Sequence, residues 1–251
     1  MTETLSRRER QREATFTTIV ETSRELLREG AELSLRAVAA RMGMTAPALY
    51  RYVASYQELV DLVAFEIDRS ATEEFRAAAE TQPTDDVAAQ LVCAAVAFRR
   101  WALRDRSEFT LAFANPIADS ACVRRELLTA ATSGHYFNGL LLELWRRNRF
   151  PRPDLSELDP AVAEAMKDPV FPADVSAIPL EDRGLLWVFQ QAWATLYGTV
   201  TLEVFGHMDP RVIESGALFE QMMRGWMPRL AIEDPDGRYA ALLHDEIVRS
   251  D

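Results

Sequence analysis

The chain has 251 residues, of which 48% are hydrophobic, so it is long enough to bury one large core or two smaller ones. Cys93 and Cys122 lie far apart and form no CxxC pair, and no charged segment followed by an apolar one begins the chain. These features argue against a disulfide-rich secreted protein. No apolar run approaches the length of a membrane span, so we expect a cytoplasmic protein with no membrane partner.

The net charge of −11 is distributed unevenly along the chain. The first 60 residues hold nine arginines against eight glutamates, a balance of +1, so the remaining residues carry −12. Four of these arginines lie between positions 7 and 12, at the start of a helix that we predict over residues 7–29. Such a cluster is typical of a surface that binds a phosphate backbone. Because Glu9 and Glu13 alternate with the arginines, a solvated helix face is the alternative.

Residues 33–53 have the pattern of two short helices joined at a glycine. Ser34 is a good N-cap for the first helix, and apolar residues follow it at helical spacing. Gly43 ends that helix, because glycine adopts the left-handed conformation at a helix C′ position without a clash. Thr45 then caps the second helix, and Pro47 fits its first turn. The pattern predicts a helix-turn-helix.

The rest of the chain is also predicted to be helical, which makes the fold class all-α. Residues 151–182 are the exception, because they hold six prolines and only residues 161–167 look helical. A connection this long inside a compact domain is usually functional or disordered. The predicted helices cover residues 55–80, 85–104, a short segment with Phe109 and Phe113, 119–149, 182–206 and 211–230.

The helix-turn-helix resembles the tetracycline-repressor-type (TetR) family of one-component transcriptional regulators. The residues that carry the resemblance are Arg36 to Ala39, Gly43 to Thr45, Leu49, Tyr50 and Ser55. At the place of the family's phosphate-binding lysine this chain has Tyr56, which brings a hydrogen-bond donor without a charge. The resemblance implies an N-terminal three-helix DNA-binding domain over residues 1–53.

The second half of the chain resembles a TetR subgroup that is named for its tryptophan, histidine and glycine (WHG). The match lies in the run from Ala192 to Gly198, where Tyr197 holds the place of the histidine. The resemblance implies that residues 54–251 form a C-terminal helical bundle for ligand binding and dimerisation.

Candidate DNA contacts follow from the resemblance and from position on the two short helices. Arg36 is the candidate for a bidentate guanine contact, with a surface salt bridge as the alternative. Ala46 and Pro47 suit thymine methyl groups, whereas the hydroxyl side chains suit phosphates. Tyr50 has packing against the first helix as its alternative. The full set is Arg8, Arg10, Ser34, Arg36, Thr45, Ala46, Pro47, Tyr50, Arg51, Tyr52 and Tyr56.

Aromatic and polar residues of the C-terminal helices are candidates for an effector pocket. Pockets are mostly apolar with a few polar groups, and so are protein cores, so a place in the core is the alternative for each residue. His135 is the sharpest case, because a lone histidine on an apolar helix face needs a partner. The set is Trp101, Phe109, Phe113, His135, Tyr136, Asn138, Gln190, Trp193 and Tyr197.

The last two predicted helices, 182–206 and 211–230, are candidates for a dimer interface. In the second, apolar residues repeat at four-three spacing, which is typical of a seam that packs against a partner helix. Two such helices from each subunit would form a four-helix interface. The candidate interface residues are Trp187, Ala194, Gly198, Phe205, Val212, Phe219, Met223 and Trp226.

The sequence lacks the motifs of the common catalytic and metal sites. It has three histidines, no HExxH, no G-x-S-x-G and no phosphate-binding loop, so we expect no enzyme, catalytic residue, metal or cofactor. The resemblance implies a ligand-responsive regulator, a repressor that binds a palindromic double-stranded DNA operator as a homodimer and is released by a small apolar or aromatic effector. Two alternatives stay open: a helical small-molecule-binding protein or enzyme with a DNA-binding-like head, and a regulator without a small-molecule effector.

Overall fold

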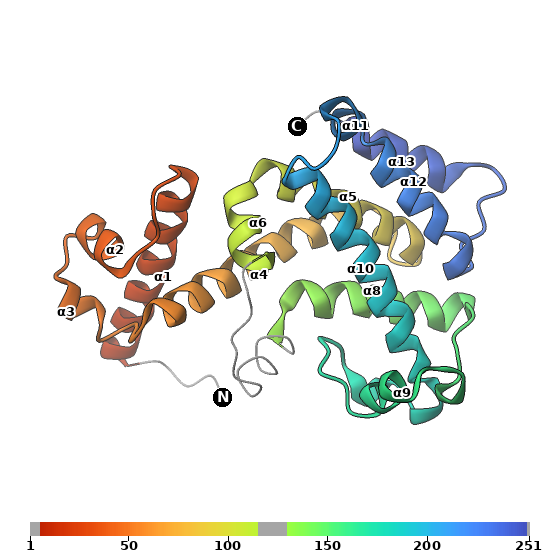
Figure 1. The fold of residues 1–251 in the computed structure, drawn as a ribbon, viewed down its shortest axis with the longest axis horizontal. Helices are drawn as coiled ribbons and strands as arrows, with labels where there is room; N and C mark the ends of the chain where they lie inside the picture. Colours follow the sequence, from red (N-terminus) through yellow and green to blue (C-terminus); the bar gives the residue numbers. More distant parts are fainter. Residues whose placement is uncertain (1–5, 115–129, 250–251) are drawn as a thin grey trace. The chain divides into compact units, whose positions relative to one another are not determined.

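The computed structural model describes residues 6–114 and 130–249 (Figure 1). Within these ranges the chain forms α-helices and short 3-10 turns and no β-strand, which confirms the predicted all-α class. No helix in the described part is both long enough and apolar enough to cross a membrane. The chain divides into two compact units. Residues 6–68 and 105–114 form the head unit, and residues 69–104 and 130–249 form the C-terminal unit.

The head unit begins with a long helix whose start is fixed by a capping box. The Ser6 hydroxyl accepts a hydrogen bond from the Glu9 amide at 3.3 Å, and the Glu9 carboxylate accepts one from the Ser6 amide at 2.7 Å. Apolar side chains from every helix of the unit then form its core. The helices are α1 (Arg7–Arg28), α2 (Leu35–Arg41), α3 (Ala46–Leu49), the first half of α4 (Tyr56–Ala79) and α6 (Arg106–Phe113).

The predicted helix-turn-helix is confirmed as α2 and α3. The Ser34 hydroxyl caps α2 by accepting a hydrogen bond from the Ala37 amide at 3.2 Å. Gly43 takes the left-handed conformation with φ of 66°, which turns the chain sharply between the two helices. Thr45 occupies the N-cap position of α3, but its side chain makes no capping hydrogen bond, so the prediction of a Thr45 cap is wrong in that respect.

The C-terminal unit is built around α5, which packs against α8, α10 and α13 and is buried along most of its length. Because α5 is Ala-rich and apolar over most of its surface, neighbouring helices can approach it from several directions. The helices of this unit are the second half of α4, α5 (Val87–Arg104), α8 (Thr132–Asn148), α9 (Pro160–Lys167), α10 (Gly184–Val204), α11 (Pro210–Ser215), α12 (Ala217–Trp226) and α13 (Arg238–Val248).

Two predicted helices are interrupted in the structure, and one helix of the structure lies outside the predicted ones. The helix predicted over 119–149 begins partly outside the described residues, and its described part is broken at Ala131, whose ψ of 113° is not helical. The helix predicted over 211–230 is broken at Gly216, which has φ of 65° and separates α11 from α12. The helix α13 was not predicted at all. Its signals are local ones, a cap from Asp234 and an apolar face that repeats at helical spacing.

The proline-rich connection between α8 and α10 is ordered and anchored. It contains α9 and three single-turn 3-10 helices, Leu155–Glu157, Val175–Ala177 and Leu180–Asp182. The Arg183 guanidinium donates to the carbonyls of Ile178, Val175 and Lys167 at 2.8, 3.1 and 3.2 Å, which ties successive turns of the connection together. Side chains that lie buried inside the unit come from Met166, Phe171 and Ile178.

Candidate DNA-binding and effector sites

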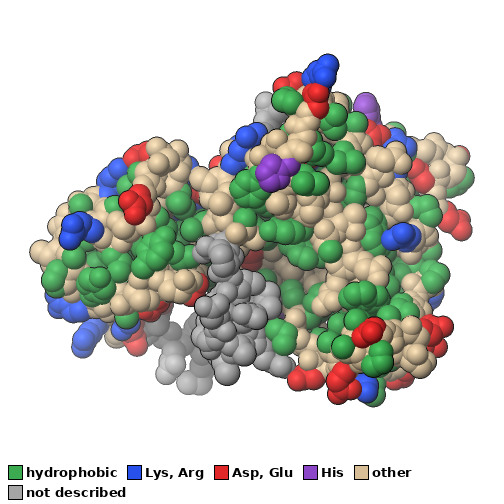
Figure 2. Space-filling view, viewed as in Figure 1, with side chains coloured by type: hydrophobic (Ala, Val, Ile, Leu, Met, Phe, Trp, Pro, Cys, Tyr) green, Lys and Arg blue, Asp and Glu red, His purple; other side chains and the backbone are tan. Residues whose placement is uncertain are grey.

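The candidate DNA contacts all belong to the head unit and are accessible. Arg8, Arg10 and Arg36 are exposed, as are Pro47 and Arg51. Figure 2 shows several basic side chains on the face of this unit that is turned to the viewer. Of the other candidates, Thr45, Tyr50 and Tyr56 are exposed, and Ser34, Ala46 and Tyr52 are half-buried.

One tyrosine of the turn region supports the helix-turn-helix from inside. Tyr52 packs edge-to-face on Phe16 of α1, with ring centroids 5.7 Å apart, and the Arg12 guanidinium lies 5.5 Å from the Phe16 ring. Tyr50, for which packing against the first helix was the alternative, is instead exposed. The packing role therefore belongs to Tyr52, and the Tyr50 hydroxyl is free to reach outward.

The arginines of the head unit divide into paired and available ones. Arg41 pairs with Glu29 at 2.6 Å, and this hydrogen-bonded pair lowers the pKa of the Glu29 carboxyl. Arg24 and Arg28 both pair with Glu108. No carboxylate among the described residues pairs with Arg36 or Arg51. The alternative of a surface salt bridge at Arg36 therefore has no partner within the described part of the chain.

Six aromatic side chains of the C-terminal unit form one cluster, which we call the aromatic cluster. Phe98 lies at its centre, with its ring centroid 5.5 Å from that of Phe75 and 5.6 Å from that of Trp193. Tyr197 stacks on Trp193 at 5.8 Å and forms the outer edge, where both side chains are half-buried. The members are Phe75, Phe98, Trp101, Phe137, Trp193 and Tyr197.

The predicted effector residues only partly coincide with this cluster. Trp101, Trp193 and Tyr197 belong to it, whereas Phe75, Phe98 and Phe137 were missed, because they come from different helices and share no sequence spacing. Of the other candidates, Phe109 and Phe113 stack on each other in the head unit, and Gln190 is half-buried.

Three polar candidates were expected to line an effector pocket, and the structure gives each of them a different environment. His135 is exposed, so it is not a buried histidine. Tyr136 lies under the Arg76 guanidinium at 4.9 Å, and burial raises the pKa of its phenol to about 12. Asn138 is buried and donates to the Pro172 carbonyl at 2.9 Å, which holds the proline-rich connection against α8.

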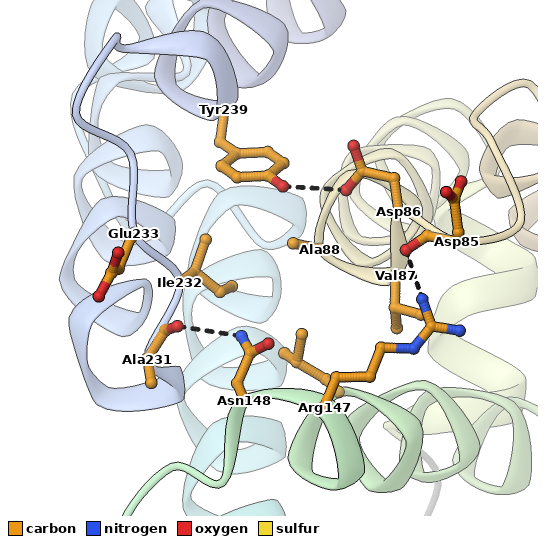
Figure 3. A pocket seen from close by; sticks show the side chains of 11 residues that line it. Asp85, Asp86, Val87, Ala88, Arg147, Asn148, Ala231, Ile232, Glu233 and Tyr239 are labelled. Atoms are coloured by element: carbon orange, nitrogen blue, oxygen red, sulfur yellow. Dashed lines mark hydrogen bonds between the residues drawn. The ribbon is translucent and has the colours of Figure 1, made fainter.

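A separate polar pocket of about 390 Å³ lies at the start of α5 (Figure 3). Asp86 caps α5 by accepting from the Ala89 amide at 3.0 Å, and it also accepts from the Tyr239 hydroxyl at 3.0 Å and from Arg238. Burial opposes ionisation of Asp86, but these hydrogen bonds outweigh it and lower its pKa. Asn148 donates to the Ala231 carbonyl at 3.0 Å.

Polar groups of this pocket make hydrogen bonds between segments of the chain. They attach α13 and the segment before it to α5 and α8, as the dashed contacts in Figure 3 illustrate. None of the effector candidates from the sequence lies among the lining residues. The aromatic cluster therefore remains the better effector candidate.

The candidate dimer residues are divided between surface and core. Ala194, Phe205 and Val212 are exposed, and Trp187, Gly198 and Met223 are half-buried. Phe219 and Trp226 are buried inside the C-terminal unit, so their side chains are already covered within one chain. The break at Gly216 lets α12 turn this apolar side toward α10 of the same chain.

Other large apolar side chains of α10, its C-terminal end, α11 and α12 are exposed, and we call this set the α10–α12 face. Four large side chains carry it, and Figure 2 shows apolar side chains over α10 with few charged ones. Leu202 and Leu218 were missed by the sequence reasoning, because helical spacing does not tell which apolar side meets the partner. The four are Leu202 and Phe205, each 41% exposed, Val212, 39% exposed, and Leu218, 38% exposed.

Comparison with known proteins now decides the family. Residues 91–225, more than half of the chain, match the sequence profile described as the tetracyclin repressor-like C-terminal domain. The chain belongs to the TetR family. The TetR match runs from within α5 to the last turn of α12.

Relatives of this TetR protein bear names that agree with the helix-turn-helix. The HTH-type transcriptional regulators Rv1816 of Mycobacterium tuberculosis and Mb1846 of Mycobacterium bovis are each 26% identical over 211 residues, which cover 80% of this chain and 85% of the relative. The crystal structure of the regulatory protein SCO4313 aligns with a TM-score of 0.58 at 25% identity, over 89% of this chain and 100% of that one. The protein is thus a transcriptional regulator of the TetR type.

Proposed function

We propose that this TetR regulator is a repressor that binds a palindromic operator as a homodimer and leaves it when a small apolar or aromatic effector binds. The observation that carries the proposal is the exposed helix-turn-helix, in which Arg36 and Arg51 are not paired with any described carboxylate while Arg41 is. An unpaired, exposed guanidinium can make bidentate contacts to a base without first losing a partner.

The proposed division of labour on DNA follows from side-chain chemistry. Arg36 reads a guanine, and Ala46 and Pro47, which carry no hydrogen-bonding side chain, meet thymine methyl groups. Arg8 and Arg10, at the start of α1, contact phosphates and carry no base information.

This division gives the first prediction. Arg36→Ala should cost about 1 to 3 kcal/mol of operator-binding free energy and relax the preference at one base pair in each half-site. Arg8→Ala should instead weaken binding to all sequences alike and reduce the salt slope by about one. Binding isotherms on operator and random duplexes at several salt concentrations separate the two effects. Equal losses on both duplexes for Arg36→Ala would exclude a base contact.

We place the dimer contact on the α10–α12 face. Exposed apolar side chains cost free energy in water, and a two-fold axis lets the same side chains of a second copy cover them. Two recognition helices held in this way reach successive major grooves of one operator, about one helical turn apart.

We place the effector at the outer edge of the aromatic cluster, where Trp193 and Tyr197 are half-buried and stacked. Flat aromatic side chains bind aromatic ligands by offset or edge contacts. The bond from Asn138 to Pro172 holds the proline-rich connection against α8, the helix that also carries Phe137 of the cluster.

A panel of small aromatic compounds, scored by release of operator, tests this placement. If a compound releases operator from the wild type, releasing operator from Trp193→Ala should need about a tenfold higher concentration of it. An aromatic contact together with the apolar area that it covers contributes about tenfold to affinity. Trp145→Ala is the matched control, because Trp145 lies outside the cluster, under the Arg149 guanidinium at 4.4 Å. If the two variants respond alike, the effector binds elsewhere.

A second candidate function is a TetR regulator without a small-molecule effector. It is favoured by the interior of the cluster, where Phe75, Phe98 and Trp101 are fully buried against one another. Side chains of the protein itself thus occupy the centre of the cluster. A panel in which no compound changes operator affinity, together with a protein partner that does, would favour this alternative.

A further inference from the structure

The polar pocket at the start of α5 has the size and the mixed lining of a small-molecule site. Its volume of about 390 Å³ lies within the range of about 300 to 1,000 Å³ that is usual for such sites. Val87, Leu144 and Ile232 supply apolar surface to the lining, and polar side chains supply much of the rest (Figure 3). A ligand can therefore cover part of a hydrocarbon body here and direct polar groups to the lining.

Most of the polar pocket lies outside the part of the chain that matches the TetR C-terminal profile. Residues 85–88 precede the matched range of 91–225, whereas residues 231–233 and Tyr239 follow it. Within the matched range, only α8 contributes to the lining. The polar pocket also shares no residue with the aromatic cluster. It is therefore a feature of the segments that flank the matched domain.

The basic side chains at the polar pocket are already paired within the chain. Arg147 pairs with Glu143 at 2.9 Å and also donates to a backbone carbonyl of the lining. Arg238 pairs with Asp86. These arginines therefore compensate Glu143 and Asp86, and they leave the other carboxylates of the lining without a counter-charge.

Three hydrogen-bond acceptors of the lining remain open. The exposed carboxylates of Asp85 and Glu233 pair with no cation among the described residues, and the two residues lie on opposite sides of the pocket (Figure 3). Asn148 uses its amide nitrogen for the Ala231 carbonyl at 3.0 Å, and no group in the described part of the chain donates to its Oδ1. Open acceptors and uncompensated negative charge favour a ligand that donates hydrogen bonds and carries positive charge.

The backbone beside the polar pocket has a costly conformation at two neighbouring places. Arg149 ends α8 with φ of 51°, and Ala231 ends the single 3-10 turn Pro228–Leu230 with φ of 48°. Within the described ranges, these are the only residues other than glycine that have positive φ. The hydrogen bond from Asn148 to Ala231 joins the two helix ends. Strained backbone of this kind is concentrated at binding sites in proteins, and it is consistent with a ligand site here.

We propose that the polar pocket binds a small organic cation, an amine or a guanidine on an apolar body, at a site separate from the proposed effector site. The cationic groups pair with Asp85 and Glu233, and one N–H donates to Asn148 Oδ1. The apolar body covers Leu144 and Ile232. Because the lining comes from α5, α8, α13 and the segment before α13, a bound cation joins these parts and stabilises the folded unit.

Three compounds of one shape test the charge that the polar pocket selects. They are 1,4-bis(aminomethyl)cyclohexane, 1,4-cyclohexanedimethanol and 1,4-cyclohexanedicarboxylate, which carry positive, no and negative charge at neutral pH. In millimolar excess over the full-length protein, the diamine should slow hydrogen exchange in residues 85–90 and 231–239 and give a saturable calorimetric isotherm. The diol should bind at least about tenfold more weakly, and the dicarboxylate should not bind. Equal binding of diamine and diol, protection confined to other segments, or no diamine binding at all would overturn the proposal.

Charge-removing variants test which carboxylates hold the cation. Asp85→Asn and Glu233→Gln should each weaken diamine binding by about three- to tenfold, because each removes one of the two open charges. Both side chains are exposed, so the fold should survive, and circular dichroism checks this. Asp236→Asn is the matched control, because it removes an exposed carboxylate of the same segment that lies outside the lining. It should keep the wild-type affinity. If all three variants lose affinity equally, the diamine responds to the net charge of the protein, which contradicts a site in the polar pocket.

Trp193→Ala separates the polar pocket from the proposed effector site. Trp193 belongs to the aromatic cluster and does not line the polar pocket, so this variant should bind the diamine as the wild type does. A loss of diamine binding in Trp193→Ala would place the compound at the aromatic cluster and would overturn the proposal. Because no DNA is present in these measurements, their outcome is separate from that of the operator-release experiment.

Discussion

Replacing Arg99 with alanine is expected to lower the free energy of unfolding by about 3 to 5 kcal/mol, because it leaves a buried carboxylate without its counter-charge. In the C-terminal unit, Arg99 Nε donates to Glu203 Oε2 at 2.6 Å, and Nη2 donates to the Ile213 carbonyl at 2.7 Å. The two side chains are 8% and 0% exposed, and the guanidinium lies 5.5 Å from the Phe219 ring. One arginine therefore joins α5, α10, α11 and α12.

The loss should depend on pH in a definite direction. Burial raises the pKa of Glu203 above its ordinary value, and Arg99 opposes this rise. The other oxygen, Oε1, is buried without a hydrogen-bond partner in the described structure, so it does not favour the charged form. In Arg99→Ala the pKa rises further, because the opposing charge is gone. Folding then favours the protonated carboxyl, so the loss is smallest below the ordinary pKa of glutamate and grows as the pH rises through the folded-state value.

Urea unfolding of the wild type and of Arg99→Ala at acidic and neutral pH measures both effects. Adding Glu203→Gln to Arg99→Ala should recover part of the loss at neutral pH, because the amide carries no charge. Arg104 lies on the same helix as Arg99 and makes an exposed pair with Glu74 of α4, so Arg104→Ala should cost only about 0 to 1 kcal/mol. A loss of that small size in Arg99→Ala would mean that the buried pair contributes little.

Leu202→Glu is expected to convert the protein to monomers and to lower operator affinity by about two orders of magnitude or more. Our proposal puts Leu202 on the α10–α12 face, where a two-fold axis brings the new charge close to its own copy. A dimer binds its second half-site at a high effective concentration, and that gain of about 100-fold to 10,000-fold disappears in a monomer. Because Leu202 is 41% exposed, the fold of each subunit should survive.

Sedimentation, circular dichroism and operator binding on the same preparation check this expectation. Val248→Glu is the matched control, because Val248 is also an exposed aliphatic residue, on α13 rather than on the α10–α12 face. It should remain a dimer with unchanged affinity. If Leu202→Glu sediments as a dimer, the subunits meet through another surface.

The helix-turn-helix could be predicted because its signals are local. A capping hydroxyl at Ser34 and a left-handed glycine at Gly43 act within one turn of the chain, so their effect does not depend on distant residues. The role of the apolar repeat over 211–230, by contrast, depends on residues far away in the sequence. Spacing alone shows that Phe219 and Trp226 need cover, but only the tertiary structure shows that the same chain supplies it. The helix break at Gly216 turns the apolar side of α12 toward α10 of the same chain.

Sequence reasoning can name a candidate residue from its type and its place on a helix, but it cannot name the residue's partners from distant parts of the chain. Arg36 was singled out by its position, but the pairing that occupies Arg24 and Arg28 comes from a residue more than 70 positions away and leaves no pattern in the sequence. The aromatic cluster was found only in part for the same reason. Its central ring, Phe98, is defined by neighbours from other helices.

Because α6 belongs to the head unit, the DNA-binding part of this protein is not one continuous segment that can be transferred alone. A fragment that ends at the predicted boundary of residue 53, or even at residue 68, lacks α6, which packs on α1. Arg24 and Arg28 would then lose their shared carboxylate, and the core of the head unit would lose the buried Phe109 ring. Chimeras that exchange heads between TetR relatives should therefore transplant residues 105–114 together with the N-terminal segment.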